Sequence, residues 1–158
     1  MTANELLIHL TRSQIKETFD AARQLPTERL NWQPAPGARS ALDQLQELAT
    51  ALDFNWDVYT QRKVEWSQEK AERWTSYRAQ FTDIDTLEKM AMTGTERLAE
   101  FLSIFDPADY SAPVEFPFPG EFNMADCLAY HYWNATYHNG QINYIASLIP
   151  EEAAAEEV

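Results

Sequence analysis

The alternation of apolar and polar residues predicts four long helices. Apolar side chains recur at spacings of three and four over four segments, residues 2–25, 40–62, 83–105 and 123–148, which places them on one face of an α-helix. Few Val and Ile residues, four glycines and eight prolines make an all-β or Rossmann fold a poor match. The pattern therefore predicts an all-α four-helix bundle with long inter-helix connections.

Capping residues mark where these helices begin. Thr2 and Glu5, and likewise Ser40 and Asp43, have the spacing of a capping box, in which side chains satisfy the unpaired backbone donors of the first turn. Asp83 or Asp85, and Asn123, are expected to cap the third and fourth helices. In the first segment, one apolar line includes Leu6 and a second includes Phe19, so we expect that helix to pack between two neighbours.

The connections between the helices are long and carry prolines or aromatic residues. Residues 64–81 are polar, rich in Trp and Tyr and without a sustained apolar stripe, so we expect a connection with a short helix. Residues 110–122 contain three prolines and form an extended loop. Because long connections do not force sequence neighbours to be antiparallel, the topology stays open. Gly94, on the apolar face of the third helix, predicts close approach of another helix.

Composition limits the class of protein. We expect one domain, residues 1–149, followed by a frayed acidic tail, residues 150–158. The formal net charge of -13 and the scattered Lys and Arg residues argue against a nucleic-acid partner. The single cysteine excludes an internal disulfide, and no leader or membrane-spanning run is visible. These features predict a soluble cytoplasmic protein with no membrane partner.

The fourth segment carries two of the three histidines on its apolar stripe. His131 and His138 both point toward the core, where an imidazole needs hydrogen-bond partners or a metal. They cannot share one metal, because seven residues of helix separate them by about 10.5 Å of rise. Cys127 lies on the same stripe and is expected to be an inert small apolar side chain rather than a nucleophile.

The spacing around His138 suggests one metal-binding set. Asn134 lies one helical turn before it, and Glu47 stands at the head of a second apolar line on the second helix. If those helices pack together, Glu47, Asn134 and His138 could hold a divalent metal, with Gln141 as a supporting hydrogen-bond donor. The alternatives are a Glu47 side chain that reaches water and a hydrogen-bonded polar core without metal.

Two runs of sequence resemble a known family. Residues 134–142 (NATYHNGQI) are similar to the last-helix signature of the DinB/YfiT-like superfamily, and residues 30–40 (LNWQPAPGARS) resemble its first linker. The resemblance implies a four-helix bundle, a homodimer and a divalent metal, zinc or nickel, held by three histidines. His138 matches the last of these histidines, whereas Asn134 and Glu47 stand where the family has the other two.

Three functions remain open from the sequence. The first is a metal-dependent transferase or isomerase acting on a small molecule, with a thiol as cosubstrate and His131 or Tyr137 as proton donor. The second is a non-catalytic bundle that binds a small molecule or a protein partner without metal. The third is metal-free acid–base catalysis by His131 with Glu47, which requires that the two side chains meet.

Overall fold

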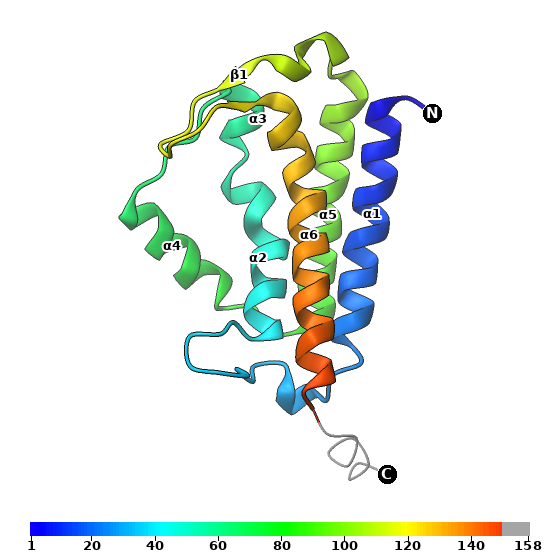
Figure 1. Cartoon of the computed structure of the whole chain (residues 1–158), viewed down its shortest axis with the longest axis vertical. Coiled ribbons are helices and arrows are strands. Elements are labelled where there is room, and N and C mark those ends of the chain that lie inside the picture. The colour runs from blue at the N-terminus through cyan, green and yellow to red at the C-terminus, as the bar shows by residue number, and fades with distance from the viewer. Residues whose placement is uncertain (150–158) are drawn as a thin grey trace.

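The computed structural model describes residues 1–149 and shows a four-helix bundle, which confirms the expected all-α class. The bundle consists of α1 (Ala3–Ala22), α2 (Ala41–Phe54), α5 (Ile84–Ile104) and α6 (Met124–Ser147) (Figure 1). The acidic tail proposed for residues 150–158 lies outside the described residues.

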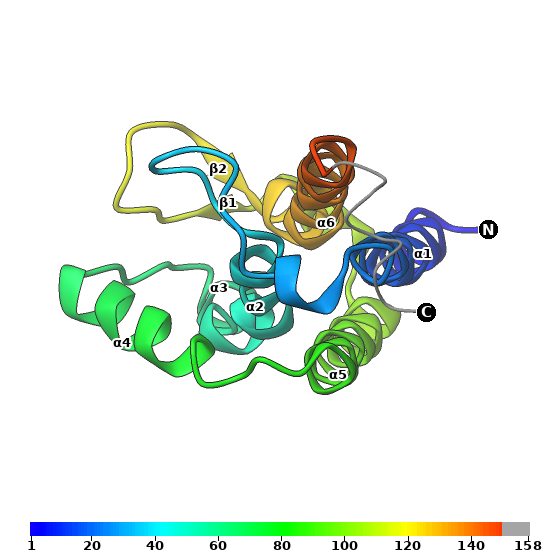
Figure 2. The same ribbon diagram turned by 90° about the horizontal axis from the view of Figure 1, so that it is seen from below.

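The helices that are neighbours in space are not always neighbours in sequence. α1 packs against α5 and α6, and α2 packs against the same two helices, so α1 and α2 occupy opposite corners, as Figure 2 shows in end view. α1 and α6 run in one direction, and α2 and α5 run in the other (Figure 1). In chain order, α1, α2, α5 and α6 therefore run down, up, up and down in Figure 1, and the long connection between α2 and α5 allows these two helices to be parallel, which the sequence left open.

The helix starts follow the capping residues closely. Thr2 and Glu5 form a complete capping box at α1, and Asn123 and Asp126 form another at α6. The side chain of Ser40 accepts the backbone N–H of Asp43 at the start of α2, and Asp83 caps α5. Each cap satisfies a backbone donor that would otherwise lack a partner.

The second helix ends earlier than expected. The expectation of one helix to residue 62 is wrong, because α2 stops at Phe54 and a short α3 (Asp57–Gln61) follows. Asn55 is the C-cap of α2, and both its backbone N–H and its side-chain amide donate to the Ala51 carbonyl at 3.1 Å. Arg62 then adopts a left-handed conformation, with φ of 52°.

The aromatic connection contains one helix, α4 (Gln68–Arg78), which has no buried residue. Among the contacts that attach this crossover to α2 are three polar ones. The indole N–H of Trp74 donates to Thr50 at 2.7 Å, the Gln46 amide donates to the Phe81 carbonyl at 2.7 Å, and Arg78 pairs with Asp43 at 2.9 Å. α4 thus stands outside the bundle on the α2 side (Figure 2).

The second long connection folds back over the same side. β1 (Pro113–Val114) pairs antiparallel with β2 (Phe122–Asn123), and an isolated bridge joins Lys63 to Glu115. Two short 3₁₀ turns, Thr27–Arg29 and Pro107–Ser111, complete the connections. The chain between β1 and β2 therefore lies beside the segment that follows α3, at the end of α2 (Figure 1).

The core lies between the four long helices, with Ile15, Phe19, Leu45 and Leu128 almost fully buried. The apolar line through Leu6 was assigned too broadly, because that side chain is 45% exposed. Gly94 does mark a close approach, since a Cβ built there would lie 3.3 Å from the Leu52 side chain. None of the helices described over residues 1–149 is long and apolar enough to cross a membrane.

Candidate functional site

A buried polar cluster joins α2 to α6. His138 Nε2 lies 3.3 Å from Glu47 Oε1, and the side-chain amide of Asn134 donates to the same oxygen at 3.1 Å. His138 and Asn134 are buried and Glu47 is nearly so. The structure thus brings together the three side chains for which the sequence suggested a shared site.

The other nitrogen of His138 has two acceptors. Its Nδ1 lies 3.0 Å from Gln44 Oε1 and 3.2 Å from Gln141 Oε1. Gln141 thus contacts His138 through its side-chain oxygen, an acceptor, whereas the sequence suggested a donor. Gln44 was missed, although a polar residue between Ala41 and Leu45 on the main stripe of α2 was a signal for it.

The second oxygen of Glu47 faces two guanidinium groups. Arg39 lies 2.6 Å from Glu47 Oε2 and Arg78 lies 3.4 Å from it. Both arginines also pair with Asp43, which gives two cations and two anions in one cluster. The sequence did not reveal this arrangement, because Arg39 lies in a linker and Arg78 in a crossover without clear periodicity.

These neighbours fix the charge of Glu47. Burial alone raises the pKa of its carboxyl group, but the hydrogen bond with His138 and the positive charge of Arg39 outweigh burial and hold the pKa well below its ordinary value. Glu47 is therefore ionised throughout the physiological pH range.

The cluster matches a divalent metal in spacing but not in charge. A separation of 3.3 Å between Glu47 Oε1 and His138 Nε2 would suit two ligands at about 2.0 to 2.2 Å from one zinc ion. However, the charge of Glu47 is already balanced by two guanidinium groups, and these would repel a divalent cation. Asn134 adds only a neutral amide. Within residues 1–149, no three His, Cys, Asp or Glu side chains gather in a way that could hold a metal ion.

His131 lies apart from this cluster and contacts α5. The Thr95 hydroxyl lies 2.8 Å from the Ala91 carbonyl and 3.3 Å from His131 Nε2. Thr95 is thus the hydrogen-bond partner of Nε2. Among the described residues the buried Nδ1 has no hydrogen-bond partner. Burial lowers the pKa of His131 to about 4, so its ring is neutral at pH 7.

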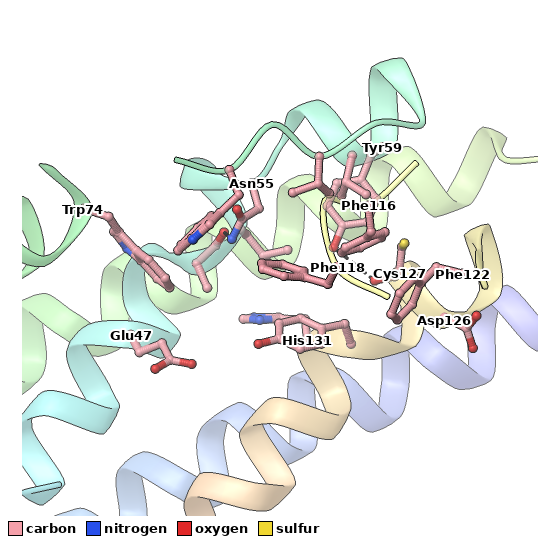
Figure 3. Close-up of a pocket in the computed structure, with 16 residues that line it drawn as sticks. Glu47, Asn55, Tyr59, Trp74, Phe116, Phe118, Phe122, Asp126, Cys127 and His131 are labelled. Carbon is pink, nitrogen blue, oxygen red and sulfur yellow. Dashed lines mark hydrogen bonds between the residues drawn. The ribbon is translucent and has the colours of Figure 1, made fainter. Parts of the chain in front are cut away.

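A cavity of about 430 Å³ lies between α2, α3, the crossover, the β1–β2 loop and the first half of α6. Glu47 and His131 both line it, together with Cys127 and Asp126. Seven of the sixteen lining residues are Phe, Trp or Tyr: Tyr59, Trp66, Trp74, Phe116, Phe118, Phe122 and Tyr130. Figure 3 shows Glu47 on α2 and His131 on α6 extending toward these side chains.

Tyr137 and Cys127 occupy less reactive places. Tyr137 is 51% exposed and stacks on Trp133, with ring centroids 5.5 Å apart, so it touches the cluster only through the edge of the His138 ring. Burial raises the pKa of Cys127 to about 11, which agrees with the expected inert thiol. The catalytic roles considered for His131 and Tyr137 stay predictions.

Fold and site together define a helical-bundle protein with a polar α2–α6 cluster beside an aromatic cavity. The family model of the DinB superfamily matches residues 9–142. The chain belongs to the DinB superfamily.

Two solved structures have the same fold. One is described as the conserved protein of locus from Enterococcus faecalis, with 14% identity, a TM-score of 0.69 and coverage of 94% of this chain and 98% of that chain. The other is the colibactin self-resistance protein ClbS in complex with a dsDNA, with 10% identity, a TM-score of 0.69 and coverage of 95% and 99%. At such low identities the likeness shows the fold alone. No curated protein matches the chain.

Proposed function

We propose that this DinB-superfamily protein binds a small, mostly apolar molecule in the aromatic cavity and that it does so without a metal. The observation that carries the proposal is the cavity itself. Its volume of about 430 Å³ lies within the range of small-molecule sites, and apolar walls with a few polar groups are typical of such sites.

The polar cluster supports this function by holding the cavity wall together. Glu47 lines the cavity and at the same time contacts Asn134 and His138 on α6 and Arg78 on the crossover. One carboxylate thus connects three elements around the cavity. A charge-balanced network of this kind fixes side-chain positions, which lowers the entropic cost of binding a ligand.

A metal-dependent transferase or isomerase that uses a thiol is the second candidate. One observation favours it, the 3.3 Å separation of Glu47 Oε1 and His138 Nε2. The two arginines beside Glu47 weigh against it, so we assign no chemical step to a metal.

The family resemblance also supports a homodimer. The exposed rings on α6 offer a surface of the kind that protein partners cover, and they belong to Tyr130, Trp133, Tyr137 and Tyr144.

Binding in the cavity can be tested with N-phenyl-1-naphthylamine, a neutral aromatic probe that fluoresces in apolar surroundings. We expect one probe per chain with a Kd on the order of 10 μM, about 7 kcal/mol of binding free energy. Ala51 lines the cavity and is buried, so Ala51→Phe should fill part of the space and weaken binding at least tenfold.

The matched control is Trp133→Ala, which removes an exposed aromatic side chain outside the cavity lining. It should leave the Kd unchanged. Both variants should first be shown to unfold cooperatively, so that a loss of binding is not a loss of fold. Probe binding that survives Ala51→Phe but disappears in Trp133→Ala would place the ligand on the surface of α6 and refute the proposal.

A further inference from the structure

The cavity wall carries negative charge and no formal positive charge. Its ionisable lining includes the carboxylates of Glu47 and Asp126, and none of the described residues that line it is Lys or Arg. Arg39 and Arg78 lie behind Glu47 and are matched there by Asp43 and Glu47 itself. Asp126 therefore contributes a negative charge that this cluster does not cancel.

Several hydrogen-bond donors in the wall already have partners. The indole N–H of Trp74 donates to Thr50 at 2.7 Å, the Tyr59 hydroxyl donates to the Cys127 carbonyl at 3.3 Å, and the Asn55 amide donates to the Ala51 carbonyl at 3.1 Å. These three donors are therefore not available to a hydrogen-bond acceptor of a ligand. A ligand rich in acceptors, such as a carboxylate or a phosphate, would find these three donors already engaged.

Unpaired polar groups are also left in the wall. His131 Nδ1 has no partner among the described residues and belongs to a side chain that is only 1% exposed, and it accepts a hydrogen bond when the ring proton is on Nε2. One oxygen of Asp126 accepts the backbone N–H of Asn123 at 3.0 Å, which leaves further lone pairs of that carboxylate for a ligand. The wall is thus suited to a ligand that brings N–H donors.

The aromatic walls favour the same kind of ligand. Trp66, Phe116, Phe118, Phe122 and Tyr130 line the cavity, and the faces of such rings attract cations, with Trp the strongest of them. A net charge of -13 also raises the local concentration of cations around the protein.

We propose that the ligand of this cavity is an organic cation, a protonated amine on an aromatic or apolar body, with its charge neutralised by Asp126. This inference rests on the proposed small-molecule binding and adds the chemical class. The apolar body fills the space between the aromatic side chains, and an N–H or O–H of the ligand can donate to His131 Nδ1.

Three probes of nearly equal shape separate charge from shape: 1-naphthylmethylamine, 1-naphthylmethanol and 1-naphthoate, each titrated calorimetrically at pH 7.5 in low salt. We expect the amine to bind at least tenfold more tightly than the alcohol and the naphthoate more weakly than either. In Asp126→Asn, the preference for the amine over the alcohol should fall below threefold, while the Kd of the alcohol stays the same.

The control is Glu17→Gln, which removes an equal charge from an exposed position on α1 and should preserve the tenfold preference. Equal binding of amine and alcohol, or an undiminished preference in Asp126→Asn, would overturn the cation assignment. So would failure of all three probes in a protein that still binds N-phenyl-1-naphthylamine. Failure of every probe, including that one, would instead refute small-molecule binding in this cavity.

Discussion

His131 should make the protein unstable in mild acid. Burial lowers the pKa of its ring from the ordinary 6.5 to about 4. Between these two pH values the ring is protonated in the unfolded chain and neutral in the folded chain. The stabilising contribution of the neutral ring is therefore complete above pH 6.5 and is lost as pH falls toward 4.

The size of this effect follows from the two pKa values. One pH unit corresponds to 1.36 kcal/mol, so the fall from pH 6.5 to pH 5.0 should cost about 2 kcal/mol of unfolding free energy. Carboxylates contribute little in this range, because most of them titrate below it. Urea denaturation at pH 7.5 and pH 5.0 measures the loss directly.

The variant His131→Leu isolates the contribution of this ring. The Thr95 hydroxyl keeps its bond to the Ala91 carbonyl, so leucine leaves no new unpaired donor. The wild type should lose about 2 kcal/mol more than the variant between the two pH values. Replacement of the exposed His9 by Gln should leave the wild-type behaviour unchanged. Equal losses in the wild type and His131→Leu would refute the burial argument.

Three further predictions concern the other buried groups. Glu47→Gln should lower the unfolding free energy in urea by about 2 to 4 kcal/mol, because the guanidinium groups of Arg39 and Arg78 would then share Asp43 as the one anion left in this cluster. Removing the exposed Asp53 partner of Arg97 should cost much less, and equal costs would contradict the assignment. Elemental analysis should find less than about a tenth of an equivalent of zinc or nickel in protein that was purified without a histidine tag and incubated with the metal, since the arginines repel the ion. If the wild type retained one full equivalent of metal and His138→Ala lost it, the metal hypothesis would be restored. The pKa of Cys127 is raised to about 11, so its thiol should react with iodoacetamide at pH 8 at least about 100-fold more slowly in the native protein than in urea. Mass spectrometry can follow both reactions. Comparable rates would show that the thiol is not buried.

The helices could be predicted because their signals are local. Capping side chains and apolar spacing act within one or two turns, so Thr2, Ser40, Asp83 and Asn123 located four helix starts. The break after Phe54 was missed, because the apolar spacing continues across Asn55, where α2 ends, and through α3. The order of the helices in space depends on long connections, which carry no periodic signal.

The sequence predicted only the part of the site that helices α2 and α6 contribute. Glu47, Asn134 and His138 are set by helical register, and the prediction that they meet depended on one assumption about packing. Arg39 and Arg78 come from irregular connections, and they change the charge of the cluster. The cavity was also missed, because it is formed by the crossover and the β1–β2 loop, whose aromatic residues look in sequence like simple anchors.

The pairing of α1 with α6 has a consequence for synthesis in the cell. The face of α1 that carries Ile15 and Phe19 packs in part against α6, which the ribosome completes more than a hundred residues later. At 5 to 20 residues per second, the interval is on the order of 10 s. During that time the nascent chain exposes an apolar helix face that chaperones can bind, so the bundle is expected to close only after its last helix has left the ribosome.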